Sequence, residues 1–254
     1  MRFANAIVRT PGPSMIHGLT SANLGKPDYE KALAQHAAYI RALESCGLQV
    51  TVLPHDNDYP DSTFVEDTAL VTPACAIIMR PGAPSRRGET TAIENPLTKF
   101  SMHIGRVVSP GTVDAGDIMM AGDHYYIGLS QRTNAEGASQ VIRVLEKYGL
   151  TGSTVLLKDA LHLKSGVAYL EEGWLVTGGE FVGRREFSEF KTILVESDEQ
   201  YAANCLWVND RVLVAAGFPK TKQAIETCGF ETVQLEMSEF QKLDGGLSCL
   251  SLRF

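Results

Sequence analysis

Apolar positions along this chain alternate between a helical spacing and short continuous runs. The first helical stretch covers residues 29–46, and its inward face is formed by Tyr29, Leu33, Ala37, Ile40 and Leu43. Asp28 is placed to cap the start of this helix, and Gly47 to end it. The apolar run over residues 49–53 that follows predicts a strand.

The same order of helix, glycine and strand occurs twice more. The copies are a helix over 135–148 with a strand over 154–157, and a helix over 219–228 with a strand over 232–235. Asn134 is the expected cap of the first copy, and Gly149 and Gly229 follow the two helices. The recurrence indicates that one structural unit is repeated along the chain.

Two weaker copies lie between the strong ones, which makes about five units in all. A helical stretch over 90–100 precedes a strand over 106–108, and a short segment over 186–190 precedes a strand over 192–195. Residues 1–9 are expected to form a first strand. An ordinary α/β protein with several helix-to-strand connections would give a similar pattern and is the alternative.

The polar segments that follow the strands hold the candidate chemistry. They cover residues 61–67, 111–117, 161–166 and 244–249. Equivalent loops of a repeated fold lie on one face, which is often the binding face. Acidic residues, a histidine and a cysteine are therefore expected to converge there, although they are far apart in the sequence.

Cys249 and His162 form the candidate nucleophile and base of a thiol enzyme. A thiol with an ordinary pKa of ~8.5 is mostly protonated at neutral pH, so a neighbouring cation must favour the thiolate. The alternatives are a buried core cysteine and a structural histidine. The glycines Gly245 and Gly246 precede Cys249 and allow a sharp turn or a close approach.

Carboxylates and arginines supply the remaining candidates. Glu66 and Asp67 lie in an apolar context, where a guanidinium would satisfy them well. Asp114 is a candidate to orient His162, and a simple turn is the alternative for Asp61, Asp114 and Asp117. The candidate anion ligands are Arg86 and Arg132, for which an exposed surface position is the alternative.

Composition narrows the class of protein. The net charge is -7 with no basic stripe, which argues against nucleic acid as a partner. No apolar run approaches the ~20 residues of a membrane span. Five cysteines without CxxC spacing and a start too polar for a secretory signal favour reduced thiols in the cytoplasm and no structural zinc site. With no linker in view, residues 1–254 are interpreted as a single catalytic domain.

Taken together, the motifs resemble the dimethylarginine dimethylaminohydrolase family, bacterial type, over essentially the whole chain. The segments that carry the resemblance are residues 24–29, 64–67, 111–117, 131–134, 161–164, 203–209 and 244–249. The resemblance implies a five-bladed α/β propeller of ββαβ units with pseudo-five-fold symmetry. It also implies hydrolysis of Nω-methylated arginines to citrulline and a methylamine, through a covalent thiouronium and without a cofactor.

The resemblance also implies a role for each candidate. Cys249 would be the nucleophile and His162 the general acid and base, supported by Asp114. The substrate-binding residues would be Leu19, Asp61, Phe64, Glu66, Asp67, Arg86, Arg132 and Leu243. Among them, Glu66 and Asp67 would hold the guanidinium, Arg86 and Arg132 the α-carboxylate, and Asp61 the α-amine. A loop over residues 10–25 would be the lid, and zinc could inhibit at Cys249 and His162.

Asp114 departs from the glutamate that several bacterial members carry, and its shorter side chain must still reach His162. Two rival functions remain, namely an arginine deiminase and a non-catalytic amino-acid-binding propeller. Arginine deiminases are typically longer and contain a helical insertion that this sequence lacks. The expected partner is a small-molecule substrate, with neither nucleic acid nor membrane; a homodimer is one option for the oligomeric state.

Overall fold

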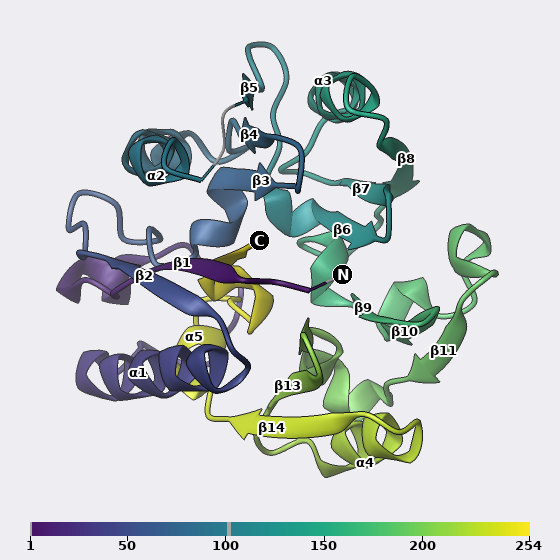
Figure 1. The fold of residues 1–254 in the computed structure, drawn as a ribbon. Coiled ribbons are helices and arrows are strands. Elements are labelled where there is room, and N and C mark those ends of the chain that lie inside the picture. The colour runs from purple at the N-terminus through teal and green to yellow at the C-terminus, as the bar shows by residue number, and fades with distance from the viewer. Residues whose placement is uncertain (1, 101–102) are drawn as a thin grey trace.

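Five three-stranded sheets surround a central axis in the computed structural model, which describes residues 2–100 and 103–254 (Figure 1). In every sheet the middle strand pairs antiparallel with one neighbour and parallel with the other. The strands nearest the axis are β3, β6, β9, β12 and β15, several of which contact one another across blades. The chain is therefore a five-bladed α/β propeller, as predicted.

Four of the blades share one order: inner strand, middle strand, helix, outer strand; in the fourth blade, 3-10 turns take the place of the helix. The first blade consists of β15 (Leu252–Arg253), β1 (Asn5–Arg9), α1 (Tyr29–Ser45) and β2 (Gln49–Leu53). The second consists of β3 (Ala69–Val71), β4 (Ala76–Ile78), α2 (Thr91–Leu97) and β5 (Ile104–Arg106). The third consists of β6 (Ile118–Ala121), β7 (His124–Leu129), α3 (Ala135–Glu146) and β8 (Thr151–Leu156).

The fourth and fifth blades complete the circle. The fourth consists of β9 (Val167–Glu171), β10 (Trp174–Thr177) and β11 (Lys191–Leu194). The fifth consists of β12 (Leu206–Val208), β13 (Arg211–Ala215), α4 (Pro219–Thr227) and β14 (Glu231–Leu235), and α5 (Ser238–Gln241) follows it.

The predicted helix ends are confirmed by their hydrogen bonds. The Asp28 carboxylate accepts from the Lys31 amide at the start of α1, and the Asn134 side chain accepts from the Gly137 amide at the start of α3. Glycines with φ between +77° and +93° follow the three strong helices at positions 47, 149 and 229. Only glycine adopts this region without strain, so it ends each helix.

The fourth blade corrects the sequence prediction. Its connection between β10 and β11 contains two 3-10 turns, Gly179–Phe181 and Arg185–Phe187, instead of an α-helix over 186–190. Gly179 and Gly183 have positive φ and interrupt helical conformation before this segment, and the turn within it ends at Phe187. In the second blade, α2 lies within the helix predicted over 90–100, and β5 begins two residues before the strand predicted over 106–108. Residues 101 and 102 lie outside the described residues.

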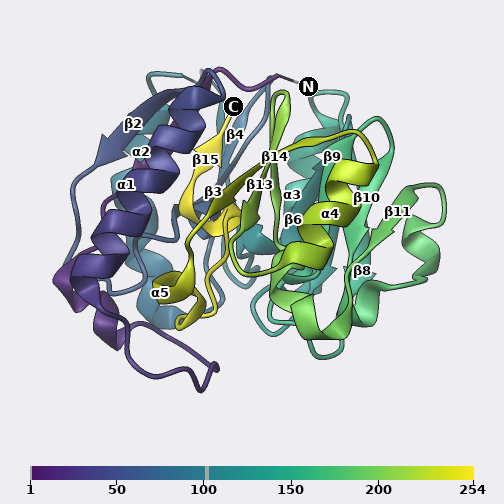
Figure 2. The same ribbon diagram turned by 90° about the horizontal axis from the view of Figure 1, so that it is seen from below.

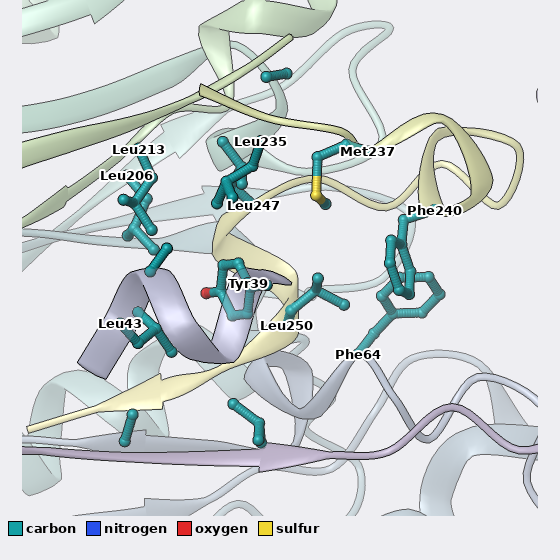
Figure 3. Packing of buried hydrophobic residues seen from close by; sticks show 14 of the residues in the cluster. Tyr39, Leu43, Phe64, Leu206, Leu213, Leu235, Met237, Phe240, Leu247 and Leu250 are labelled. Carbon is teal, nitrogen blue, oxygen red and sulfur yellow. The ribbon is translucent and has the colours of Figure 1, made fainter. Parts of the chain in front are cut away.

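The largest apolar cluster joins α1 to the fifth blade and to the tail that carries Cys249. Figure 3 shows Tyr39 and Leu43 of α1 beside Leu247 and Leu250, which flank the cysteine turn. Leu247 and Leu250 are fully buried, and the Tyr39 hydroxyl lies 2.6 Å from the Ser251 hydroxyl. The segment around Cys249 is therefore anchored in the core on both sides.

The first blade is assembled from both ends of the chain. Strand β15 pairs antiparallel with β1, with Ala6 opposite Arg253, so residues 252–254 supply the inner strand of the blade. Figure 2 shows the two termini on one face of the propeller, with α5 and the loop from β1 to α1 on the opposite face. No helix among the described residues is long and apolar enough to cross a membrane.

Candidate active site

Short 3-10 turns lie between each outer strand and the next inner strand. They are η2 (Val65–Thr68), η4 (Ala115–Asp117), η5 (Leu163–Ser165), η8 (Ser197–Ala203) and η9 (Ser248–Leu250). Glu66, Asp67, Asp114, His162 and Cys249 lie within or directly beside four of these turns, whereas Leu19, Asp61, Arg86, Arg132 and Leu243 come from other loops and turns. The predicted convergence of the loops is therefore confirmed.

A cavity of about 280 Å³ opens between these turns. Its walls include nine of the predicted residues: Leu19, Asp61, Phe64, Asp67, Arg86, Arg132, His162, Leu243 and Cys249. Asp114 is fully buried behind His162 and does not line this cavity. Glu66 lines a second cavity instead. The cavity volume is close to the lower end of typical small-ligand pockets.

Asp114 reaches His162 in spite of its short side chain. Its Oδ2 lies 3.1 Å from His162 Nε2, and its Oδ1 accepts a 2.8 Å hydrogen bond from the Gly82 amide. Burial alone would lower the pKa of His162, but the carboxylates of Asp67, Asp117 and Asp114 outweigh it and raise the pKa to about 9. The imidazole is therefore protonated at neutral pH.

Asp67 faces the cavity from η2. Its Oδ1 accepts from the Gly116 amide at 2.9 Å, and its Oδ2 from Arg86 Nη1 at 2.5 Å. Burial opposes ionisation, but Arg86 and His162 hold the pKa of Asp67 down at about 2. A side chain at Gly116 would collide with Asp67 Oδ1 and His162 Nδ1, so this glycine allows the two groups to approach.

Arg86 is largely occupied by the protein itself. Its Nε and Nη2 donate to the buried Glu89 carboxylate, and Nη2 also donates to the Phe64 carbonyl at 3.0 Å. With Nη1 bound to Asp67, one of its five N–H donors is left without an acceptor among the described residues. Arg132, whose side chain is 21% exposed and 3.6 Å from Asp114, is the freer arginine of the cavity.

Glu66 corrects the sequence prediction, because it does not join Asp67. Its carboxylate accepts from Ser248 Oγ at 2.8 Å and pairs with Lys164 at 2.7 Å and Arg253 at 3.0 Å. These groups border a separate cavity along the propeller axis. Neighbouring residues of a 3-10 turn point about 120° apart, so adjacent carboxylates of η2 face different cavities.

The Cys249 thiol lies in the η9 turn, with its sulfur 3.3 Å from the Gly246 amide that donates to it. Burial raises the pKa of Cys249 to about 12, and the Glu66 and Asp67 charges act in the same direction. The free protein at neutral pH therefore combines a neutral thiol with an imidazolium. A cation that enters the cavity beside the sulfur would favour the thiolate.

The glycine pair before Cys249 is required by close packing. Asp244 has φ of +58°, while a Cβ on Gly245 would lie 2.2 Å from Phe64 and a Cβ on Gly246 would lie 2.5 Å from Asn204. Contacts this short cannot exist between real side chains, so glycine is needed at both positions. The left-handed residue of this turn is the aspartate in front of the pair.

The loop from β1 to α1 covers part of the cavity and is tied to it at three points. The Leu19 amide donates to Asp61 Oδ1 at 2.9 Å, and the Ser21 hydroxyl donates to Asp244 Oδ2 at 3.0 Å. The Thr20 hydroxyl donates to the Lys242 carbonyl at 2.8 Å. This arrangement is that of the predicted lid.

Two polar residues of the site were missed as such from the sequence. Asp117 is fully buried and accepts from the Leu163 amide at 2.9 Å and from Ser130 Oγ at 2.7 Å, so it fixes the backbone beside His162. Asn204, at the end of η8, bonds to the η9 turn. The signal that could have identified them was position, since Asp117 lies directly before the inner strand β6 and Asn204 lies two residues before the inner strand β12.

The ligand atoms of Asp67, Asp114 and His162 lie within 4.8 Å of one another, the spacing of a metal site. Metal ligation would require His162 to lose its proton, which the three surrounding carboxylates oppose. The positive imidazolium already compensates this acidic cluster. Zinc inhibition at Cys249 and His162 stays a prediction.

Comparisons with known proteins agree with this geometry. The family described as N,N dimethylarginine dimethylhydrolase, eukaryotic, matches residues 23–168. The N(G),N(G)-dimethylarginine dimethylaminohydrolase of Pseudomonas aeruginosa is 56% identical over 253 residues, which are 99% of this chain and 100% of the relative. The chain belongs to the dimethylarginine dimethylaminohydrolase family.

Solved structures of dimethylarginine dimethylaminohydrolases are similar over nearly the whole chain. A C249S mutant of the Pseudomonas aeruginosa protein complexed with citrulline has a TM-score of 0.99 at 55% identity, covering 100% of both chains. An H162G adduct with S-methyl-L-thiocitrulline has a TM-score of 0.98 at 55% identity, covering 99% of this chain and 100% of the other. This chain has a cysteine and a histidine at the positions so numbered.

Proposed function

We propose that this protein hydrolyses Nω-methylated arginines to citrulline and a methylamine. The observation that carries the proposal is the convergence of Cys249, His162 and Asp67 on the walls of one cavity together with Asp61 and Arg132, in a member of this family. The cavity thus offers groups for the guanidinium, the α-amine and the α-carboxylate of a single amino acid.

Charge complementarity orients the substrate. Asp67 faces the guanidinium, and because its pKa is held at about 2 it stays ionised. Asp61 receives the α-amine beneath the lid at Leu19, and Leu243 contributes to the same wall. Arg132, with the remaining Nη1 donor of Arg86, receives the α-carboxylate.

Binding of the cationic guanidinium favours loss of the Cys249 proton to solvent. The thiolate attacks the guanidinium carbon and forms a C–S bond, and the displaced electron pair moves to nitrogen. His162 has Nε2 held by Asp114, so its Nδ1 protonates the departing amine as the C–N bond breaks. A covalent thiouronium remains on Cys249.

The second half of the reaction uses the same histidine as a base. The now neutral His162 removes a proton from water, and the resulting hydroxide attacks the thiouronium carbon. The C–S bond breaks, its electron pair returns to Cys249, the hydroxyl proton passes to solvent, and citrulline is released with a neutral side chain. A histidine pKa near 9 suits the acid step, because the proton is present at neutral pH before the amine departs.

Incubation with dimethylarginine, monomethylarginine and arginine, assayed for citrulline and for the released amine, tests the function. We expect citrulline with dimethylamine or methylamine, and turnover of arginine at least about tenfold slower. Citrulline from arginine alone would instead identify an arginine deiminase. Absence of citrulline from all three substrates would favour an amino-acid-binding propeller.

The pH dependence of turnover tests the role of Asp114. In Asp114→Asn the side chain still accepts from the Gly82 amide, but one of the three carboxylates that raise the His162 pKa is lost. The pKa of His162 then falls below about 9, so the alkaline limb of kcat moves to lower pH and kcat drops on the order of 10²-fold.

Asp114→Glu is the matched control, because it retains the negative charge and should keep the alkaline limb near that of the unmodified enzyme. An alkaline limb that stays in place in Asp114→Asn would contradict the assigned role.

A further inference from the structure

The fourth blade supplies no acid, base or nucleophile to the cavity, yet its η8 segment ends at the turn that carries Cys249. Asn204 follows this segment directly and is 7% exposed. Its side chain makes three hydrogen bonds, each to a residue close to one of the two reacting groups. An asparagine side chain is neither an acid, a base nor a nucleophile here, and Asn204 does not line the cavity.

Two of these bonds hold the nucleophile turn. Asn204 Oδ1 accepts from the Ser248 amide at 3.0 Å, and Nδ2 donates to Ser248 Oγ at 3.0 Å. The third bond runs from Nδ2 to the Lys164 carbonyl at 2.9 Å, two residues after His162. One side chain therefore connects the segment of the nucleophile with the segment of the acid and base.

Asn204 also packs against the donor of the hydrogen bond to sulfur. The Gly246 amide donates to Cys249 Sγ at 3.3 Å, and a Cβ on Gly246 would lie 2.5 Å from Asn204 Cγ and Oδ1. The asparagine thus contacts the turn at residue 246 and bonds to it at residue 248. The turn cannot rotate without breaking those bonds or colliding with the side chain.

We infer that Asn204 is a positioning residue for the reaction, which aims the Gly246 amide at the Cys249 sulfur and sets the sulfur opposite His162. The turnover measurements rest on the proposed function. The expected effect of Asn204 on the Cys249 thiol can be measured without any substrate. Without Asn204 the Ser248 amide loses its acceptor in a buried setting, and the turn relaxes. The thiolate then loses a hydrogen bond that favours it.

Asn209 provides a matched control elsewhere in the fold. It is also buried and also makes three hydrogen bonds, accepting from the Phe3 amide and donating to the Phe3 and Cys46 carbonyls. Its φ of +58° adds strain when alanine replaces it. Asn209→Ala should therefore lower the melting temperature at least as much as Asn204→Ala. None of the three Asn209 hydrogen bonds involves the Cys249 turn.

The test compares the two variants by turnover of dimethylarginine and by iodoacetamide labelling of Cys249 without substrate, followed at that cysteine by mass spectrometry across pH. For Asn204→Ala we expect kcat to fall about tenfold or more, KM to stay within about threefold, and the labelling profile to move to higher pH. Asn209→Ala should leave both the labelling profile and kcat unchanged. Equal kcat and equal labelling in the two variants would overturn the inference.

Gly246→Ala changes the other residue of the contact between Gly246 and Asn204. It removes none of the atoms to which Asn204 is hydrogen-bonded. Its added Cβ displaces Asn204, so the labelling profile should move in the same direction. Because Asn204→Ala removes the two atoms at 2.5 Å and leaves only its Cβ at 3.0 Å, the double variant should be at most slightly worse than Asn204→Ala alone. Additive losses would overturn the inference. An unchanged labelling profile of Cys249 in every variant would also overturn the inference, and this outcome can be read even if the enzyme turns over no methylarginine.

Discussion

Cys249→Ser is expected to abolish turnover, with a loss of at least about 10⁴-fold in kcat, while the protein still binds a methylarginine. A hydroxyl is a far weaker nucleophile than a thiolate, and no neutral base is at hand to activate it, because His162 is protonated at neutral pH. Binding survives because the pKa of Cys249 near 12 makes the free thiol neutral, so serine changes no charge in the cavity.

Calorimetry with dimethylarginine and a citrulline assay measure the two halves of this prediction. Cys228→Ser is the control, since Cys228 is half-buried against the fourth- and fifth-blade core, away from the cavity, and receives the same chemical change. It should keep full activity. Turnover that persists in Cys249→Ser, or inactivation by a thiol reagent that labels only the other cysteines, would show that Cys249 is not the nucleophile.

Much of the fold could be predicted because the repeated unit is marked by signals that act between residues close in the sequence. An aspartate or asparagine cap and a left-handed glycine each act within a few residues and mark the two ends of α1 and α3, whereas α4 begins at Pro219 without a side-chain cap. The inward face of α1 was predicted less well, because Leu43 is the one predicted residue that is fully buried and the rest of the face is formed by residues such as His36 and Tyr39. The fourth blade escaped this reasoning, since its connection contains two short 3-10 turns and no amphipathic helix with a cap and a terminal glycine. The blade is held together by strand pairing, in which β10 pairs with β9 on one side and with β11 on the other.

The reactive groups of the site could also be predicted, but the direction of their side chains could not. Glu66 and Asp67 are neighbours with the same chemistry, and only the geometry of a 3-10 turn sends one to Lys164 and Arg253 and the other to the cavity. Arg86 was identified as a cation, but its partner Glu89 was not. Charge is visible in a sequence, whereas the partner that neutralises it depends on the tertiary fold.

Neutral positioning groups are harder still to find from sequence. Asn204 has no titratable proton and its three partner atoms belong to residues 40 and 44 positions away, so the segment 203–209 marks the family resemblance but gives Asn204 no role. The glycine pair at 245 and 246 was noticed for its freedom to turn, whereas its packing against Phe64 and Asn204 is a long-range contact. Both features belong to the closure of the propeller, which brings distant turns together at one point.

That closure gives the second large expectation: deleting residues 252–254 should destabilise the whole propeller. The deletion removes β15 from the first blade, the buried Leu252, and the Arg253 bonds to Glu66, Ser248 and Ser251. Burial of a leucine and several hydrogen bonds together contribute on the order of 5 kcal/mol, a large part of a typical total stability. We expect the melting temperature to fall by roughly 10–20 °C.

Thermal unfolding followed by circular dichroism measures this loss, and Arg253→Ala separates its parts. That variant keeps the β15 pairing and Leu252 but removes the side-chain bonds, so it should lie between the full chain and the deletion. Glu66 would then keep only Lys164 and Ser248 as partners, and Ser248 adjoins Cys249, so activity should fall in the same order as stability. A deletion variant that melts within 2 °C of the full chain, a difference of about 1 kcal/mol or less, would mean that the first blade is stable without its inner strand.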